Sequence, residues 1–534
     1  YSKLQPKKLL SIDQWGDIQW KDMSQAFINC HFLDVNATDA PDLTQTTSLS
    51  SMFYSASVSN GSFDSWDVSN ITDMSLMFKF NSEFNQPLNS WDTSNVTNMS
   101  GLFANAGSFN QPLNNWDVSS TLNMSNLFFD AESFNQSLNL WDLSNVTNMN
   151  GLFANAKSFN QPLNDWNTSN ALNMSAMFRA AEMFNQPLDN WDVSNVIDMS
   201  SMFKNAKVFN QSINYWDVSN VIDMSSMFHS TELFDQPLMS WDVSNVTSMD
   251  NMFTASDLFN QNINFWNVSN VTSMTSMFAI AKSFNQPLDL WDVSSVSNMN
   301  LMFDNADSFN QPLNSWNVSN VNSMVAMFAS NDVFDQPLNN WDISNVINMG
   351  GIFSSASSFN QDLSSWDFNI DSYTNIISGS GLNSSNYDLL LDRFVQLGIE
   401  DEQISAASIS YCDEFTKQVL LNDGWYIFDA GLSLNCEKYL AGKVLFDIDN
   451  DGCDVNDSNV QNYLVRVSND VEDLIVSVDE NGDYLANLNA GNYTIDFLNL
   501  NSNLTSAPDT HNVNFTTQNS MFDDLDFCIT ANQQ

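Results

Sequence analysis

The chain has 534 residues and a mass of 60.1 kDa, with 15 Lys and Arg against 63 Asp and Glu and a formal net charge of −48. The length excludes one ordinary core and predicts several domains or a repeat array, while the charge excludes nucleic acid and anionic lipid as electrostatic partners. Intrinsic disorder is excluded because 43% of the residues are hydrophobic, including 40 Phe and 16 Trp.

Residues 1–41 are predicted to form an N-terminal cap. The start Tyr1-Ser-Lys-Leu is expected to be a mature, processed end, and the sequence has no apolar run long enough for a transmembrane segment. Met23 and Phe27 match the Met and Phe positions of the later repeats, but the next strand tryptophan is Trp66. A cap is required because a terminal coil would otherwise expose its apolar face.

Residues 42–380 repeat every 25 positions. Thirteen tryptophans from Trp66 to Trp366 keep this step without a slip, and Met, Phe and Leu positions keep it as well. A fixed period of this size is typical of a solenoid, in which each unit buries its apolar face against its neighbours. The large apolar residues are therefore predicted to form a core with one layer per coil.

Each repeat predicts two elements. The segment L-x-x-W-x-V alternates so that Trp and Val would point inward from a short strand. The segment M-S-x-M-F-x-x-A has helical spacing, and F-N-Q-P-L would return the chain through a bend at Pro. The expected fold class is a repeat α/β solenoid of leucine-rich-repeat type, with one short parallel strand and one short helix per 25 residues.

The repeat W-D-V-S-N-V-T-x-M-S-x-M-F-x-x-A-x-x-F-N-Q-P-L resembles the BspA-like surface-protein repeat of Bacteroidetes and mycoplasma lipoproteins, a divergent leucine-rich repeat. The resemblance covers about residues 12–435. It implies a secreted or surface-attached protein, since members of that family are found there and several are associated with adhesion.

The residue after each repeated tryptophan is predicted to point out of the coil. One interpretation is a solvated face whose carboxylates accept hydrogen bonds from nearby Ser hydroxyls or amides. The other is a cation ladder, or a binding face for cationic or polyhydroxylated ligands. The position holds Asn in three repeats, Asn167, Asn267 and Asn317, and Asp in ten. The ligand-face candidates are Asp67, Asp92, Asp117, Asp142, Asp192, Asp217, Asp242, Asp292 and Asp342, with Asp367 at the last repeat.

Residues 381–436 are predicted to form a C-terminal cap of two helices and a strand. Asn383-Ser-Ser-Asn386 could cap a first helix that ends at Gly398. A second helix would run from about Cys412 to Leu421, followed by a strand that begins at Trp425. The alternative is a separate helical domain, for which the segment is short.

Residues 437–534 change to period two, with Asn-Gly and Asp-Gly turns between short segments. This pattern predicts a small antiparallel β-sandwich. The segment resembles the carboxypeptidase-regulatory-like and SdrD B-like modules of bacterial surface proteins.

An acidic loop in the sandwich is predicted to bind Ca²⁺ as a structural cofactor. Oxygen ligands at alternate positions and a Gly for the sharp turn are what a calcium loop requires. Ser458 occupies the position where a bidentate Glu would be expected, so Asp454 or Asp457 would close the shell, as the resemblance to SdrD-like modules implies. The alternative is an acidic turn without an ion. The predicted ligands are Asp447, Asp449, Asp451, Asp454 and Asp457.

Two disulfides are predicted from the five cysteines. Cys453 follows the turn of the acidic loop and Cys528 lies in the last strand, so a Cys453–Cys528 bond would join the ends of the sandwich. A Cys412–Cys436 bond could stabilise the C-terminal cap, and both fit an oxidising, secreted context. Cys30 would remain as a small buried core residue rather than a reactive thiol.

The sequence favours binding over catalysis. The only histidines are His31, His229 and His511, in unlike contexts, and there is no G-x-S-x-G motif, phosphate loop or H-E-x-x-H. The chain is therefore expected not to be an enzyme, although a carboxylate pair of a carbohydrate-active enzyme is a third interpretation.

The leading interpretation is a secreted, cell-surface-associated adhesion protein that recognises protein or glycan ligands with the acidic face. The resemblance implies export by the type IX secretion route of Bacteroidetes and outer-membrane association. The alternative is a structural or accessory subunit of an outer-membrane secretion or gliding-motility complex with one dedicated partner. No sorting domain is recognised before Gln534, so such a domain is expected to have been removed or to lie outside the sequence.

Overall fold

The computed structural model describes residues 9–369, 373–433, 438–449, 452–454, 457–461, 463–488, 491–498, 500–501, 503–515 and 521–531. The chain divides into two compact units, residues 1–359 with 366–377, and residues 360–365 with 378–534. Each unit has its own architecture.

The first coil starts with a short parallel pairing of β1 (Ser11–Ile12) with β2 (Asp34–Val35). Trp15 and Met23 are buried, so the apolar face of this coil is covered. Cys30 is a buried free thiol, in keeping with its interpretation as a core residue. Burial raises the pKa of the Cys30 thiol because it disfavours the thiolate.

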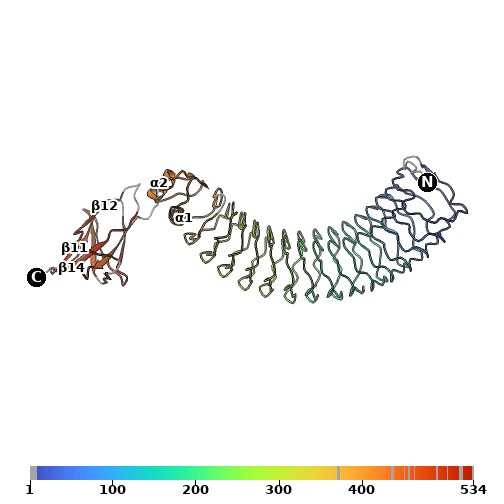
Figure 1. Cartoon of the computed structure of the whole chain (residues 1–534), viewed down its shortest axis with the longest axis horizontal. Coiled ribbons are helices and arrows are strands. Elements are labelled where there is room, and N and C mark those ends of the chain that lie inside the picture. Colours follow the sequence, from blue (N-terminus) through green and yellow to red (C-terminus); the bar gives the residue numbers. More distant parts are fainter. Residues whose placement is uncertain are drawn as a thin grey trace. The chain divides into compact units, whose positions relative to one another are not determined.

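Successive repeats lie side by side in a row (Figure 1), joined by single parallel β-bridges. The bridges run from Ser48↔Asp73 to Ser323↔Asn348, one between each repeat and the next. From Asp73 onward each bridged residue directly precedes the repeated methionine, and Ser48 precedes Leu49 at the equivalent position. Asp73, for example, forms a bridge with Ser48 of the preceding repeat and with Asn98 of the following repeat. Because equivalent residues pair in this way along the row, the repeats stay in register.

The predicted strand at the Trp–Val step is wrong, although both side chains face inward as expected. Trp66 and Val68 are buried. The amide of Ile71 donates to the carbonyl of Val68 at 2.9 Å, which closes a turn directly after the valine. This turn ends the extended segment, and the β-bridge therefore forms further along, at Asp73.

The predicted short helix of each repeat is also wrong. The described part of residues 42–380 contains no helix. The amides of Met74, Leu76 and Phe78 donate to carbonyls of the following repeat at 2.8–2.9 Å. Leu76 and Phe80 have positive φ values of 59° and 62°, and the equivalent residues of most other repeats do too. Left-handed residues at these positions turn peptide groups toward the neighbouring coil, which replaces the i→i−4 bonds of a helix.

The core of the row is built from aromatic stacks. The rings of Trp91 and Trp116 lie 6.1 Å apart with an interplanar angle of 3°. Within one coil, Phe103 and Phe109 stack at 3.9 Å. The indole Nε1 of Trp116 donates to the carbonyl of Leu88 at 2.9 Å, so the polar atom of the buried ring is satisfied by the preceding repeat. The unit is therefore a repeat array of turns and bridges with little helix.

The second unit begins with two α/β segments. Helix α1 (Ser384–Gln396) is capped by the side chain of Asn383, as the sequence predicts. It is followed by β3 (Gln403–Ala406), α2 (Glu414–Asn422) and β4 (Tyr426–Asp429). Strand β3 pairs in parallel with β4, which adds one strand to the predicted two helices and a strand.

Residues 438–531 form two sheets whose buried side chains make one hydrophobic core. The strands are β5 (Lys438–Phe446), β6 (Ser458–Asn459), β7 (Leu464–Ser468), β8 (Asp473–Ser477), β9 (Asp483–Leu488), β10 (Gly491–Phe497), β11 (Leu504–Ala507), β12 (His511–Phe515), β13 (Met521–Phe522) and β14 (Phe527–Ala531). One sheet has the order β12-β10-β7-β8, and the other has the order β11-β14-β5-β13 with β6 and β9 also paired to β5. The predicted all-antiparallel pairing is wrong for β13 and β14, which pair with β5 in parallel because the end of the chain returns along the first strand.

Candidate functional site

The position after each buried tryptophan is exposed and carries a carboxylate in most repeats. We call these residues, Asp67 and its equivalents, the acidic column. In a typical repeat, Oδ1 of Asp92 accepts the amide of Ser94 at 3.1 Å and its hydroxyl at 2.6 Å. Asn167 makes the same two contacts with Ser169 at 3.2 and 2.8 Å. Asp and Asn therefore close the same local turn, and Asp alone adds charge.

The serine contacts favour the ionised form in five members of the acidic column. The hydroxyl of Ser69, followed by its amide, lowers the pKa of Asp67 below the ordinary value. The same pair of donors lowers the pKa of Asp117, Asp217, Asp292 and Asp342. Both donors favour the charged form, so these carboxylates are negative at neutral pH. The hydrogen bonds from Ser hydroxyls and amides that were expected for a solvated acidic face are therefore present. They hold a row of carboxylates in place on the surface.

Three of the predicted calcium ligands converge in the acidic loop after β5. Asp447, Asp449 and Asp457 each offer one carboxylate oxygen, and these atoms lie within 4.8 Å of one another. Asp454 is not part of this cluster among the described residues; its amide instead donates to Oδ2 of Asp457 at 2.8 Å. Asp451 lies outside the described residues.

The converging groups fit a hard divalent cation. Asp447 is buried, and its Oδ2 accepts the amide of Gly452 at 3.2 Å. Gly452 has a φ of 104°, which lets the chain fold back over the carboxylates. Ca²⁺ takes carboxylate oxygens in loops of this kind. Asp447, Asp449 and Asp457 are the residues that would hold it.

The disulfide Cys453–Cys528 is present, as predicted, with the two Cα atoms 5.5 Å apart. It fastens the acidic loop to β14. The predicted partner of Cys412, Cys436, lies outside the described residues. Cys412 itself is buried and disulfide-bonded.

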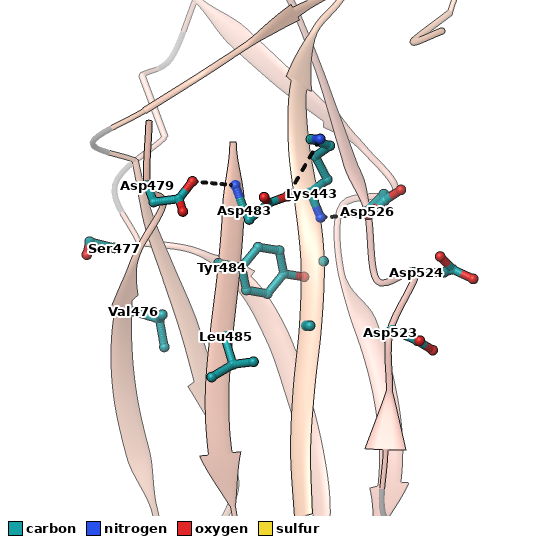
Figure 2. A pocket seen from close by; sticks show the side chains of 12 residues that line it. Lys443, Val476, Ser477, Asp479, Asp483, Tyr484, Leu485, Asp523, Asp524 and Asp526 are labelled. Atoms are coloured by element: carbon teal, nitrogen blue, oxygen red, sulfur yellow. Dashed lines mark hydrogen bonds and ion pairs between the residues drawn. The ribbon is translucent and has the colours of Figure 1, made fainter. Parts of the chain in front are cut away.

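A second acidic feature is a hollow of about 590 Å³ on the sandwich (Figure 2). It is lined by Lys443 of β5, whose Nζ lies 3.7 Å from Oδ1 of Asp483 and whose amide donates to Oδ1 of Asp526 at 2.6 Å. Figure 2 shows Asp523 and Asp524 on the far side of the hollow from Asp479. The sequence did not predict this site, because its members come from three distant segments.

Four overlapping stretches, residues 21–141, 122–239, 211–310 and 281–387, match the family described as Mycoplasma protein of unknown function, DUF285. The chain belongs to the DUF285 family. Tiled matches of this kind support a repeat surface protein. No curated protein and no solved structure matches the chain. Among the described residues, the DUF285 protein has no helix with the length and apolar character needed to cross a bilayer.

The DUF285 array also carries exposed apolar residues that sequence reasoning missed. Tyr215, Met239, Phe265 and Leu290 occupy the turn before the tryptophan in four consecutive repeats. Their exposed fractions are 83%, 64%, 71% and 59%. The signal was a departure from the repeat, since this turn usually holds Asn, Ser or Asp.

Proposed function

We propose that this DUF285 protein is a surface-exposed binding protein whose repeat array is a solenoid of leucine-rich-repeat type. The acidic column would face the medium and recognise protein or glycan ligands. The observation that carries the proposal is the recurrence of an exposed carboxylate at one position of most coils, fixed by its serine partner as Asp67 is by Ser69. A periodic row of charges suits an extended ligand, because each coil repeats the same contact.

The proposal assigns binding, not catalysis, and places the protein outside the cell. The resemblance to BspA-like repeats supports secretion through the type IX route and association with the outer membrane. The sandwich, joined by the Cys453–Cys528 disulfide, would serve as a spacer, and disulfides of this kind suit an oxidising compartment. Antibody labelling of intact, unpermeabilised cells tests the location. Labelling that requires permeabilisation would rule it out.

The binding role is tested by replacing Asp192, Asp217 and Asp242 with Asn. The fold should persist, because Asn167 naturally closes the same turn. Binding to a panel of immobilised extracellular-matrix proteins and glycans should weaken roughly ten-fold at low salt, because charged contacts at a rim mainly act through electrostatic attraction.

Asn167→Asp is the matched control, since it adds one carboxylate to the same column. It should strengthen binding of the same probes or leave it unchanged. The absence of binding to every probe, or equal binding by the parent and the triple variant, would contradict a recognition role for the acidic column.

We further propose that the acidic loop binds Ca²⁺ and stabilises the sandwich. Binding by Asp447 and Asp457 would neutralise carboxylates that the fold holds close together. Titration calorimetry of the full chain with Ca²⁺ should show a binding heat, and Ca²⁺ should raise the melting temperature of the sandwich. Both effects should disappear in Asp447→Asn, whereas Asp479→Asn, outside the loop, should keep them. A chain without binding heat and without a melting shift would end this proposal.

A further inference from the structure

Four consecutive repeats each carry an exposed apolar residue at the turn that precedes the buried tryptophan, where most other repeats are polar. We call their exposed residues, Tyr215, Met239, Phe265 and Leu290, the apolar strip. The two flanking repeats carry Asp189-Asn190 and Asn314-Ser315 at this turn. The strip is thus bounded on both sides by polar repeats.

The strip residues lie on neighbouring coils that are held in register. The rings of Trp241 and Trp266, which follow Met239 and Phe265 in the chain, stack 6.2 Å apart. The indole Nε1 of Trp266 also donates to the carbonyl of Leu238 at 3.1 Å. Since the turns are anchored by these tryptophans, their exposed side chains lie on adjacent coils at the same turn.

At Met239, the apolar residue stands where other repeats make a structural contact. Oδ1 of Asn214 accepts the amide of Ser240 at 3.2 Å, and Oδ1 of Asn264 accepts the amide of Leu290 at 3.1 Å. Met239 stands at the position of these asparagines but carries no oxygen acceptor. It contributes nothing to the core, since its exposed fraction is 64%. Exposed apolar groups in a cluster mark a contact surface.

Carboxylates flank the strip. Asp217, Asp242 and Asp292 follow the strip residues by two or three positions and are exposed. The segments 211–220, 236–245, 261–270 and 286–295 contain no Lys or Arg. A partner that covers the strip therefore meets negative charge at its border.

The charge and the residue types of the strip indicate which class of partner binds there. A second copy of this chain is disfavoured because each copy has a net charge of −48, and nucleic acid is disfavoured for the same reason. Tyr, Phe and Met are enriched in protein–protein contacts, while Met and Leu supply neither the flat rings nor the polar groups that a sugar needs. Charge complementarity adds Lys or Arg to the partner.

We propose that the apolar strip binds a polypeptide segment that combines apolar side chains with Lys or Arg. This inference rests on the proposed binding function and names the class of partner and the place where it binds. The apolar groups of the segment would cover Tyr215, Met239, Phe265 and Leu290, and its cations would pair with Asp217, Asp242 and Asp292.

The test uses the full chain as bait for a displayed library of short random peptides. The strip variant combines Tyr215→Ser, Met239→Asn, Phe265→Ser and Leu290→Ser, which are residues found at this turn in other repeats. The enriched peptides should contain both apolar and basic residues and bind the strip variant roughly ten-fold more weakly or worse. Leu140→Ser is the matched control, because Leu140 is exposed at the same turn in a repeat with polar neighbours. It should change nothing.

The outcomes separate this inference from the proposed function. Peptides without basic residues, or peptides that bind the parent and the strip variant equally, would overturn the inference while leaving a binding role intact. Glycan binding lost in the strip variant, or a dimer in sedimentation that the strip variant abolishes, would overturn it in favour of another occupant. If no peptide, matrix protein or glycan binds the parent, the proposed function fails as well.

Discussion

Asp388 lies buried in α1, where its two carboxylate oxygens each lie 3.0 Å from the amide nitrogen of Cys412. Burial raises the pKa of Asp388 from its ordinary 3.8 to about 6, and the amide contacts offset only part of this effect. The folded state therefore favours the protonated form. Its stabilising contribution is complete below pH 3.8 and is lost as the pH rises through about 6.

The loss of this contribution with rising pH predicts the behaviour of Asp388→Asn, whose side chain stays neutral at every pH. The stability of the variant relative to the parent should rise between pH 4 and pH 6.5 and level off above pH 7, by roughly 3 kcal/mol at most. Hydrogen exchange of the amides of α1 and α2, compared at each pH, measures the difference. If the substitution also weakens the contact with the amide of Cys412, it changes the stability by the same amount at every pH, so the pH-dependent part of the difference is unaffected. Parallel profiles for the two proteins would show that Asp388 does not titrate in this range.

At the scale of the element, the buried positions of each repeat could be predicted, but their backbone could not. Trp, Met and Phe positions are buried as the period requires. The apolar spacing of Met74, Met77 and Phe78 fits a helix, yet it fits the observed turns equally well, since both place these side chains on one side. A local sequence pattern cannot show that the backbone amides donate to carbonyls of the next coil.

A second signal in the sequence did point to turns. The two positive-φ positions of each repeat are rich in residues that tolerate the left-handed region, such as Gly101, Asn105, Gly151 and Asn155. A helix would favour Ala and Leu there. Gly and Asn at these two positions of some repeats thus favoured turns, although Leu76, Ala176 and Ala180 occupy the same positions in others.

The acidic loop and the hollow around Lys443 also differ in how far the sequence could predict them. The cluster of carboxylates in the acidic loop was recognisable because its members lie within a few residues of one another in the sequence. The hollow around Lys443 was not, because β9 and the segment before β14 bring Asp483 and Asp526 to it only in the folded sandwich (Figure 2). The parallel return of β14 along β5 likewise depends on long-range pairing.

At the scale of the whole molecule, the repeat array is stabilised by contacts between neighbouring coils. The amide of Met99 donates to the carbonyl of Asn123, and Phe103 stacks on Phe128 at 5.8 Å, one repeat away in each case. Such arrays behave approximately as sums of unit and interface terms. Removing one whole unit should therefore leave all remaining interfaces intact.

Deletion of residues 117–141, one period that joins Trp116 to Asp142, tests this directly. The shortened chain should fold, keep its near-ultraviolet circular dichroism per tryptophan and melt within about 5 °C of the parent. Deletion of residues 117–128 is the matched control, because it removes about half a period and brings polar residues into the Trp and Phe stacks. That variant should lose its cooperative transition. If both deletions behaved alike, the register of the aromatic stacks could not be what holds the coils together.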